Sequence, residues 1–267
     1  MVGVYWVPLL VALFASMTIW ATPSHSTTIV AIRTPDLVVI AGDSAGTFRG
    51  DGPERTRSVC KVFSVEGAGF AISGLSKDLH RGFDAETIVA KALWQRESIR
   101  GAIIEVQNKL SGTLTAELER LKKEEPTVYG KSLQEVGGCV TSVLIAAFEG
   151  HEPVASAIAF KGQEDSSGRI GLSTIYLNCP GDDCPGGVLT FFLGERGAID
   201  RYTAKHGKNF NMIPEEGAPF LVGLEIAAGT SGVGSPIDVL KITKEGLFWI
   251  TRKTGCNDPL SGFTQGK

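Results

Sequence analysis

The stretch Thr-Thr-Ile-Val-Ala-Ile at residues 27–32, followed by Leu-Val-Val-Ile-Ala-Gly-Asp at residues 37–43, decides how this chain folds. The first segment alternates as a strand does, and Thr34-Pro-Asp supplies turn residues after it. The second segment is apolar on both faces until Gly42, which is typical of a strand in the middle of a layered structure. The two segments therefore predict a central pair of strands at the start of a folded domain.

The segment ahead of this pair is uncharged and mostly apolar. Residues 1–26 contain no Lys, Arg, Asp or Glu, and the run over residues 2–21 is almost wholly apolar. About 20 apolar residues can span a bilayer. The same run fits the hydrophobic region of a secretory signal, although the usual positive charges at its start are missing. We therefore predict a signal peptide over residues 1–26, with an uncleaved membrane anchor as the alternative.

Small residues mark a cleavage point directly before Thr27. A cut there places Ser24 and Ser26 at the −3 and −1 positions, as signal peptidase requires. A cut after Ala21 is the competitor, but it would put bulky Ile19 at −3. Either way, the folded part is expected outside the cytoplasm, in a periplasmic or extracellular location.

The remaining chain alternates between groups of strands and groups of helices. Expected strands are 58–65, 68–73, 140–148, 153–161, 170–178, 188–193, 237–243 and 246–252. Expected helices are one starting at Asp84, a long one over 99–123 that Pro126 ends, and others at 197–206 and 214–228, whereas 44–57 is expected to be a loop. Grouped strands do not give the strict alternation of a parallel α/β fold. The order predicts an α+β domain over residues 27–267, with two antiparallel sheets stacked between helical layers.

The composition of the chain argues against nucleic-acid binding and against a metal or cofactor site. The chain has 267 residues, of which 43% are hydrophobic and 21% charged, so it can bury a sizeable core. The net charge is −3 and no basic run occurs, so nucleic acid is not an expected partner. The four histidines are scattered without zinc-type spacing, so neither a metal site nor another cofactor is expected.

Five cysteines fit an oxidising compartment loosely. Cys179 and Cys184 bracket Pro-Gly-Asp-Asp, and we predict a local disulfide between them. Cys60 and Cys139 lie in apolar, strand-like runs, where buried thiols are common. Cys256 lies in a polar tail, and the odd count leaves at least one thiol without a partner in the chain.

Cleavage before Thr27 would give this residue its own chemistry. A threonine hydroxyl is a poor nucleophile and needs a neighbouring base. The α-amino group has a pKa near ~8, so an N-terminal threonine carries a suitable base on its own carbon framework. The first residue after the predicted cut is thus a candidate nucleophile that exists only after processing.

Thr27, Gly42-Asp43 and the later Cys60-Lys61-Val62 together resemble the catalytic β subunits of the proteasome and the peptidase of bacterial ATP-dependent two-component proteases. These proteins are N-terminal-nucleophile (Ntn) hydrolases. The resemblance is specific around these three positions and only topological up to about Arg252. It implies a four-layer αββα sandwich. Each feature alone is ordinary strand or turn chemistry, so the hypothesis depends on their order and on the cleavage site.

The resemblance also implies a role for each matched residue. Thr27 would be the nucleophile and, through its amine, the base. Lys61, kept cationic by Asp43, would lower the pKa of that amine. Gly74 matches the position whose backbone N–H stabilises the oxyanion, a contribution of a few kcal/mol (~3).

The late part of the chain departs from the family pattern. The family often has Asp-x-x-Ser-Gly there, whereas residues 228–232 are Ala-Gly-Thr-Ser-Gly. Ser231 can therefore be matched as a supporting catalytic residue but the aspartate cannot, and Ser235 is an open alternative. The glycine that precedes the threonine in self-processing members is Ser26 here, which favours cutting by signal peptidase.

The substrate is less well defined. Gly46, Ile72 and Ser76 match pocket-lining positions of the family, and Ile72 weakly favours apolar side chains. The prediction is an exported threonine-nucleophile amide hydrolase, a peptidase, acting on a peptide or amide substrate. Two alternatives stay open: a catalytically silent scaffold with this fold, and an amidase for a small non-peptide substrate. Homo-oligomers are compatible with the resemblance, and a membrane is a partner only if residues 1–26 remain attached.

Overall fold

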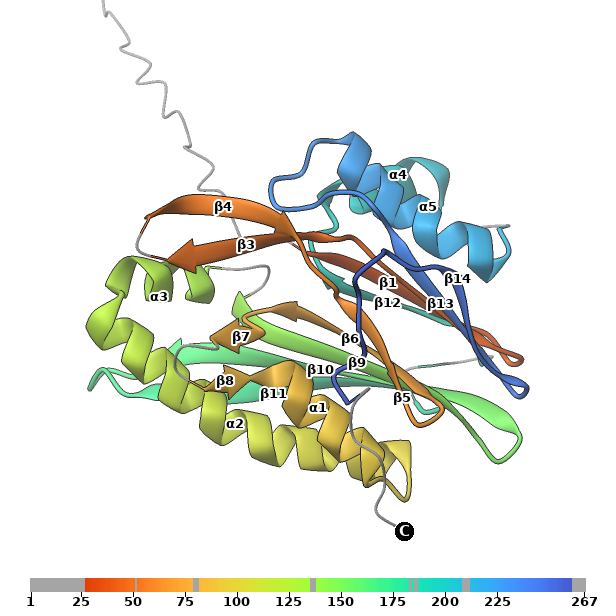
Figure 1. The fold of residues 1–267 in the computed structure, drawn as a ribbon, viewed down its shortest axis with the longest axis horizontal. Helices are drawn as coiled ribbons and strands as arrows, with labels where there is room; N and C mark the ends of the chain where they lie inside the picture. Colours follow the sequence, from red (N-terminus) through yellow and green to blue (C-terminus); the bar gives the residue numbers. More distant parts are fainter. Residues whose placement is uncertain are drawn as a thin grey trace, which may run out of the picture.

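A computed structural model of the chain describes residues 27–50, 52–78, 82–134, 138–182, 184, 187–207 and 212–260 (Figure 1). For residues 47–50 and 52–56 the description is limited to the backbone. The predicted signal peptide or anchor at residues 1–26 lies outside the described residues. None of the helices within the described ranges is long and apolar enough to cross a membrane.

One sheet is built around the opening pair of strands. Its order is β12-β1-β2-β13-β14, with antiparallel pairing throughout. The bounds are β1 Thr28–Arg33, β2 Val38–Gly42, β12 Leu189–Gly194, β13 Asp238–Thr243 and β14 Gly246–Thr251. Every residue of β1 and β2 is buried, because these strands are paired on both edges and covered on both faces. The predicted central pair is confirmed.

A second sheet has the order β11-β10-β9-β6-β5, again antiparallel. The bounds are β5 Val62–Val65, β6 Ala68–Gly74, β9 Cys139–Glu149, β10 Glu152–Glu164 and β11 Ile170–Cys179. The long β9 and β10 form the expected hairpin, with Gly150 at positive φ in its turn. Their apolar residues alternate between the two faces of the sheet, so both faces contribute to a core.

Helices follow the predicted capping and periodicity. Their bounds are α1 Ala85–Trp94, α2 Ile99–Glu124, α3 Pro126–Leu133, α4 Gly197–His206 and α5 Pro214–Ala227. The Asp84 carboxylate accepts a hydrogen bond from the Thr87 N–H at the start of α1, and Ser98 does the same at the start of α2. On α2 the predicted apolar face is buried, which fixes this helix against the second sheet.

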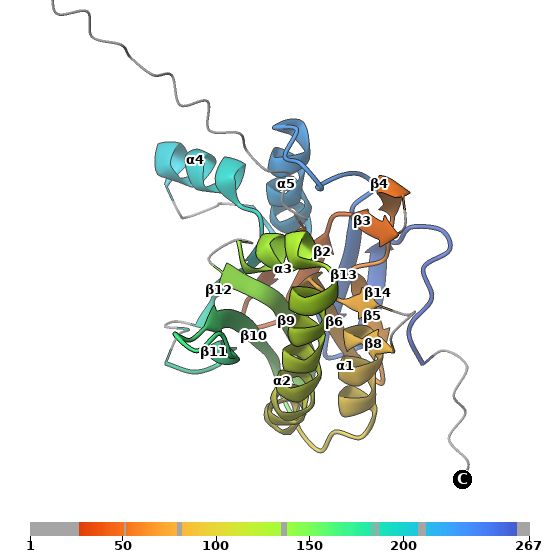
Figure 2. The same cartoon turned by 90° about the vertical axis from the view of Figure 1, so that its left-hand side faces the viewer.

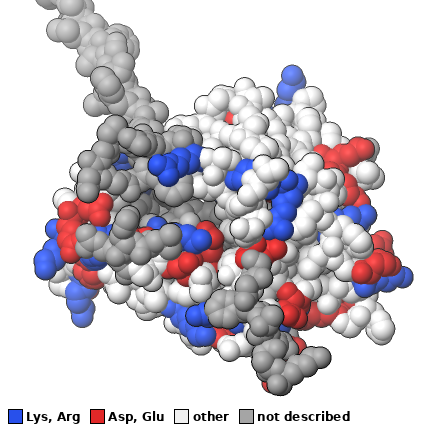
Figure 3. Space-filling view, viewed as in Figure 1, with Lys and Arg blue, Asp and Glu red and all other residues white. Residues whose placement is uncertain are grey.

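Buried apolar side chains form three clusters in the described part of the chain. One joins α1 and α2 to the second sheet, another is shared by the two sheets, and the third joins the first sheet to α4 and α5. Figures 1 and 2 show α1 and α2 outside the second sheet and α4 and α5 outside the first. These observations confirm an α+β fold with antiparallel sheets. On the face in Figure 3, basic and acidic side chains are interspersed.

Two expectations were wrong: the loop over residues 44–57, and the single strand over residues 58–65, of which only Val62–Val65 forms β5 while Ser58 ends the strand before it. The predicted loop at residues 44–57 contains a hairpin, β3 Ala45–Gly50 and β4 Gly52–Ser58, in which the strands pair only with each other. Such a hairpin needs no apolar face, so the polar sequence hid it. Pro126 does follow the end of α2, but it also opens α3, because proline at the first helical position lacks only an N–H that has no partner there. A two-residue ladder, β7 Lys77–Asp78 with β8 Phe83–Asp84, was not predicted.

Candidate functional site

Four neighbouring strands of the first sheet, β12, β1, β2 and β13, begin or end along the same margin of the sheet. This margin consists of strand ends and is called the edge below. The register pairs Thr28 with Gly194, and it pairs Gly42 with both Ile29 and Asp238. The start of β1, the end of β2 and the start of β13 therefore lie side by side. The candidate residues Thr27 and Asp43 extend from this edge.

Asp43 is the centre of the site. Its side chain is wholly buried. Oδ1 accepts hydrogen bonds from the Thr28 N–H (2.9 Å) and from Lys61 Nζ (2.7 Å). Oδ2 accepts from the N–H groups of Ala45 and Gly234, each at 3.0 Å. A buried carboxylate is tolerated only with partners of this kind, and here three donors come from other segments of the chain, while Ala45 follows Asp43 by two residues.

Lys61 links the two sheets at this edge. It directly precedes β5 in the second sheet, is only 6% exposed, and forms a buried ion pair with Asp43, which follows β2 in the first sheet. Burial lowers the pKa of Lys61, the Asp43 carboxylate opposes this shift, and the positive charge of Lys253 adds to it. The predicted contact between Lys61 and Asp43 is present.

Thr27 is held through the backbone on both sides. Its carbonyl accepts a hydrogen bond from the Glu195 N–H (2.7 Å), and the next N–H, of Thr28, donates to Asp43. The Thr28 hydroxyl donates to the Glu195 carbonyl at 2.9 Å. Gly194 has a φ of 80°, and a Cβ there would overlap the Thr27 carbonyl. This close approach requires glycine, which sequence reasoning did not single out.

Gly74 ends β6 at the corresponding edge of the second sheet. Its φ is 84°, and a Cβ there would overlap the Val140 carbonyl, so glycine is required here too. The next N–H, of Leu75, donates to that same carbonyl at 2.8 Å. Its role as oxyanion donor stays a prediction.

The late loop reaches the site through its backbone. Gly234 donates to Asp43, and its carbonyl accepts from the Ser44 N–H at 2.8 Å. Ser231, the predicted supporting residue, and its alternative Ser235 are both exposed. The catalytic role of Ser231 therefore remains a prediction, whereas Gly234 was missed because a backbone donor leaves no mark in the sequence.

The three predicted pocket residues lie in different surroundings. Gly46 is in β3, where a Cβ would meet the Val59 side chain. Ile72 is 3% exposed and packs in the cluster shared with α1 and α2. Ser76 is half-buried, and its carbonyl accepts from the Ala85 N–H at 2.9 Å. Their substrate-binding roles stay predictions.

Two disulfides are present. Cys179 and Cys184 are bonded, as predicted. Cys60, expected to be a buried thiol, is bonded to Cys256 across 196 positions. Cys139 belongs to neither bridge. The unexpected bridge attaches the C-terminal segment to the residue before Lys61.

Two further charged residues, Lys253 in this segment and Asp238 in β13, lie near the site and were not singled out from the sequence. Asp238 is 1% exposed and accepts a hydrogen bond from the Lys253 N–H at 2.6 Å. Burial raises the pKa of Asp238, and the neighbouring Lys253 opposes this shift. Asp238 is the register partner of Gly42, so both residues belong to the same edge as Asp43.

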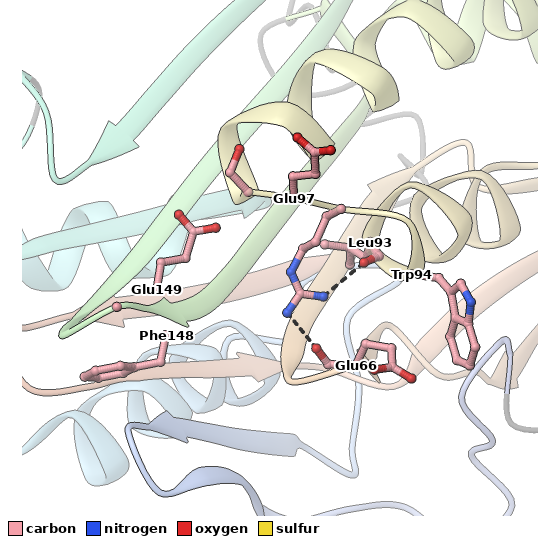
Figure 4. A pocket seen from close by; sticks show the side chains of 9 residues that line it. Glu66, Leu93, Trp94, Glu97, Phe148 and Glu149 are labelled. Carbon is pink, nitrogen blue, oxygen red and sulfur yellow. Dashed lines mark hydrogen bonds between the residues drawn. The ribbon is translucent and has the colours of Figure 1, made fainter. Parts of the chain in front are cut away.

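The hollow in Figure 4 lies elsewhere. Its volume is about 490 Å³, and it is lined by Glu66, Leu93, Trp94, Arg96, Glu97, Ser98, Phe148, Glu149 and Gly150. These residues adjoin the end of β6 at which Ala68 pairs with Ala147, whereas Gly74 pairs with Thr141 at the other end. None of the predicted site residues lines this hollow.

Comparison with known proteins yields similarity to solved structures but no match by sequence. No protein-family model matches the chain, and no curated protein matches it. Among solved structures, it is similar to the Anbu (Gly-1) mutant from Hyphomicrobium sp. strain MC1, with a TM-score of 0.48 and 15% identity over 85% of this chain and 86% of that one. A likeness at this level identifies neither a family nor an activity.

Proposed function

We propose that this protein is an exported amide hydrolase, a peptidase, in which cleavage after Ser26 frees Thr27 as the nucleophile. We also propose that the stacked sheets and outer helices are the four-layer αββα sandwich of Ntn hydrolases. One observation carries the proposal: Asp43 Oδ1 accepts hydrogen bonds from both Lys61 Nζ and the N–H that follows Thr27. A buried ammonium group is thereby held beside the backbone of the candidate nucleophile.

The chemistry follows from this juxtaposition. A cationic Lys61 disfavours a second positive charge nearby, so it lowers the pKa of a Thr27 amine below its free value near ~8. The neutral amine takes the proton of the Thr27 hydroxyl, and Oγ1 forms a bond to the substrate's amide carbon. The oxyanion that results is stabilised by a backbone N–H at Gly74.

The second half of the reaction reverses the proton path. The protonated amine gives its proton to the leaving nitrogen as the C–N bond breaks, which leaves an ester on Thr27. Water then attacks this ester, the amine again takes a proton, and Thr27 Oγ1 leaves and is reprotonated. No group beyond the chain's own residues and water is required.

The first experiment tests the terminus. The chain is expressed with residues 1–26 in a host that exports it, and the mature protein is analysed by intact mass and N-terminal sequencing. We expect a protein that begins Thr-Thr-Ile-Val. A mature chain that begins at Thr22, or an intact N-terminus, contradicts the mechanism.

The second experiment tests the nucleophile on a broad panel of peptides and amides. With correctly processed termini, Thr27→Ala abolishes turnover and Thr27→Ser retains part of it, because serine keeps both hydroxyl and amine. Thr115→Ala is the matched control, since the Thr115 hydroxyl donates to the Ser111 carbonyl within α2, at 2.8 Å. An active Thr27→Ala variant means that another residue is the nucleophile. No hydrolysis by the wild type favours a scaffold.

A further inference from the structure

The segment after β14 is tied to both sheets. The Lys253 N–H donates to Asp238 in the first sheet. Cys256 is bonded to Cys60, next to the start of the second sheet. Two residues later, Asp258 accepts hydrogen bonds from the N–H (2.7 Å) and the hydroxyl (3.0 Å) of Ser64 in β5. These anchors give Lys253 a fixed place at the edge that carries Asp43 and Lys61.

The ammonium group of Lys253 is unusual within the described residues. Lys253 Nζ is buried, and among those residues it has no hydrogen-bond partner. Buried polar groups are nearly always hydrogen-bonded, because an unpaired one loses its hydration without compensation. Lysine side chains are long and flexible, so a solvent-exposed position would ordinarily be preferred. Within the described residues, no hydrogen bond therefore compensates for the burial of the Lys253 ammonium group.

The charged groups around Lys253 come from several elements. Asp43 follows β2, Lys61 precedes β5, Asp238 begins β13, and Arg252 and Asp258 lie on the segment itself, joined at 2.9 Å. Burial lowers the pKa of Lys253, and the charges of Asp238 and then Asp43 oppose this shift. Lys253 in turn helps to lower the pKa of Lys61.

We propose that Lys253 is a positioning residue of this site, a second buried cation that Asp238 and the Cys60–Cys256 bridge hold beside the Asp43–Lys61 pair. It acts electrostatically on Lys61 and, through it, on Thr27. The link to Thr27 rests on the proposed function, whereas the link to Lys61 does not.

The expected effect has a definite sign. The Asp43 oxygens already accept four hydrogen bonds and accept none from Lys253, so Lys253 contributes charge alone. A nearby positive charge favours loss of a proton from any neighbouring amine. Removal of this charge should therefore raise the pKa of Lys61 and of a free Thr27 amine, and move the whole pH profile of hydrolysis upward.

The test compares Lys253→Met, which removes the charge, with Lys253→Arg, which keeps it. Lys244→Met is the matched control, because Lys244 lies in the turn between β13 and β14 and its side chain is 76% exposed. Lysine labelled with ¹³C at Cε is titrated by NMR, and the Lys61 signal is assigned with Lys61→Arg. We expect the Lys61 pKa to rise in Lys253→Met and to stay unchanged in the other two variants. An unchanged Lys61 titration in Lys253→Met overturns the proposal.

Hydrolysis is measured over the same pH range. On the acid limb, Lys253→Met should be about tenfold slower than the wild type, which corresponds to one unit of displacement, and the two should converge at higher pH. A uniform loss of rate without displacement of the profile indicates a purely structural residue and overturns the proposal. If Lys253→Met does not fold, Lys253→Gln serves in both measurements. The absence of any wild-type hydrolysis refutes the proposed function, while the Lys61 titration still decides on the electrostatic link.

Discussion

The two ends of the paired strands β6 and β9 both gather charged residues, but they do so differently. At the end where Ala68 pairs with Ala147, an open hollow of about 490 Å³ is bordered by Arg96 and three glutamates (Figure 4). At the other end, the carboxylate of Asp43 and the ammonium of Lys61 are almost wholly buried. The hollow is therefore at the Ala68–Ala147 end, whereas the buried charges, with their larger desolvation cost, are at the opposite end.

The hydrogen bonds explain the difference. Arg96 donates to the carbonyls of Leu93 (3.0 Å) and Glu66 (2.6 Å), so it fastens the helix corner to the β5–β6 turn. The Glu149 carboxylate accepts from the Ile99 N–H at the start of α2. These contacts hold local turns in place. Asp43 instead binds donors from three distant segments of the chain in the interior, at a desolvation cost that packing alone does not require. We therefore propose the site from the convergence of donors on a buried charge and not from the size of the hollow.

The most decisive test of this difference between the two ends is to neutralise charged residues at each end and compare the rates of hydrolysis. Lys61→Met and Asp43→Asn should reduce hydrolysis by several orders of magnitude, with Asp43→Asn the milder of the two. Lys61→Met should also lower the free energy of unfolding by about 3 kcal/mol, because it leaves a buried carboxylate without its counterion. Hydrolysis rates and urea denaturation measure both effects. Glu149→Gln is the control for turnover, and a comparable loss of rate in that variant would contradict the distinction.

A second test concerns the close approach at Thr27. Gly194→Ala forces the Thr27 carbonyl to move, and misplacement of a reacting group by about 1 Å can cost roughly 100-fold in rate. Gly229→Ala is a matched control, because Gly229 also has a positive φ (67°) but a Cβ there would meet nothing within 4 Å. The control should lose about 1–2 kcal/mol of stability from backbone strain and keep its rate. Equal rates in the two variants would show that the position of Thr27 does not depend on Gly194.

The two disulfides offer a comparison of stability. In the chain-entropy model, a bridge that closes 196 positions stabilises the fold by about 5 kcal/mol, and one that closes 5 positions by about 2 kcal/mol. We therefore expect the Cys60→Ala, Cys256→Ala double variant to unfold at much lower urea concentration than the Cys179→Ala, Cys184→Ala double variant. Equal urea midpoints for the two double variants, or midpoints in the reverse order, would contradict this expectation.

The smallest effect is expected at the hollow itself. Arg96→Met removes two hydrogen bonds to carbonyl groups and should cost about 1–3 kcal/mol in unfolding free energy. Its rate of hydrolysis should equal that of the wild type, because the opposite end of β6 is undisturbed. A large loss of rate without unfolding would make the hollow a functional site and reverse the comparison.

Much of the fold could be predicted because its elements follow simple periods. The helix at Gly197–His206 has the predicted bounds, and α2 follows the apolar face that starts at Ile99. The β3–β4 hairpin was missed because the sequence over residues 44–57 is polar and rich in turn residues, without the apolar alternation that marks a half-buried strand. Local signals thus sufficed wherever a core-facing stripe defined the element.

The site was predictable in part, for a related reason. Asp43 and Lys61 could be proposed from a short motif, and the structure brings them together. Gly234, Lys253 and the partner of Cys60 could not, because their roles arise only from contacts between segments far apart in sequence. A lysine in a polar tail looks the same whether it is solvated or buried beside another charge.

The bridge between Cys60 and Cys256 has a consequence for how the protein is made. Synthesis proceeds from the N-terminus, so Thr27, Asp43 and Lys61 exist long before Gly234 donates to Asp43 and before Cys256 can close the bridge. A half-made chain therefore carries the candidate nucleophile without its finished surroundings. Because Gly234 and Cys256 are synthesised late, the site is completed only near the end of synthesis and folding.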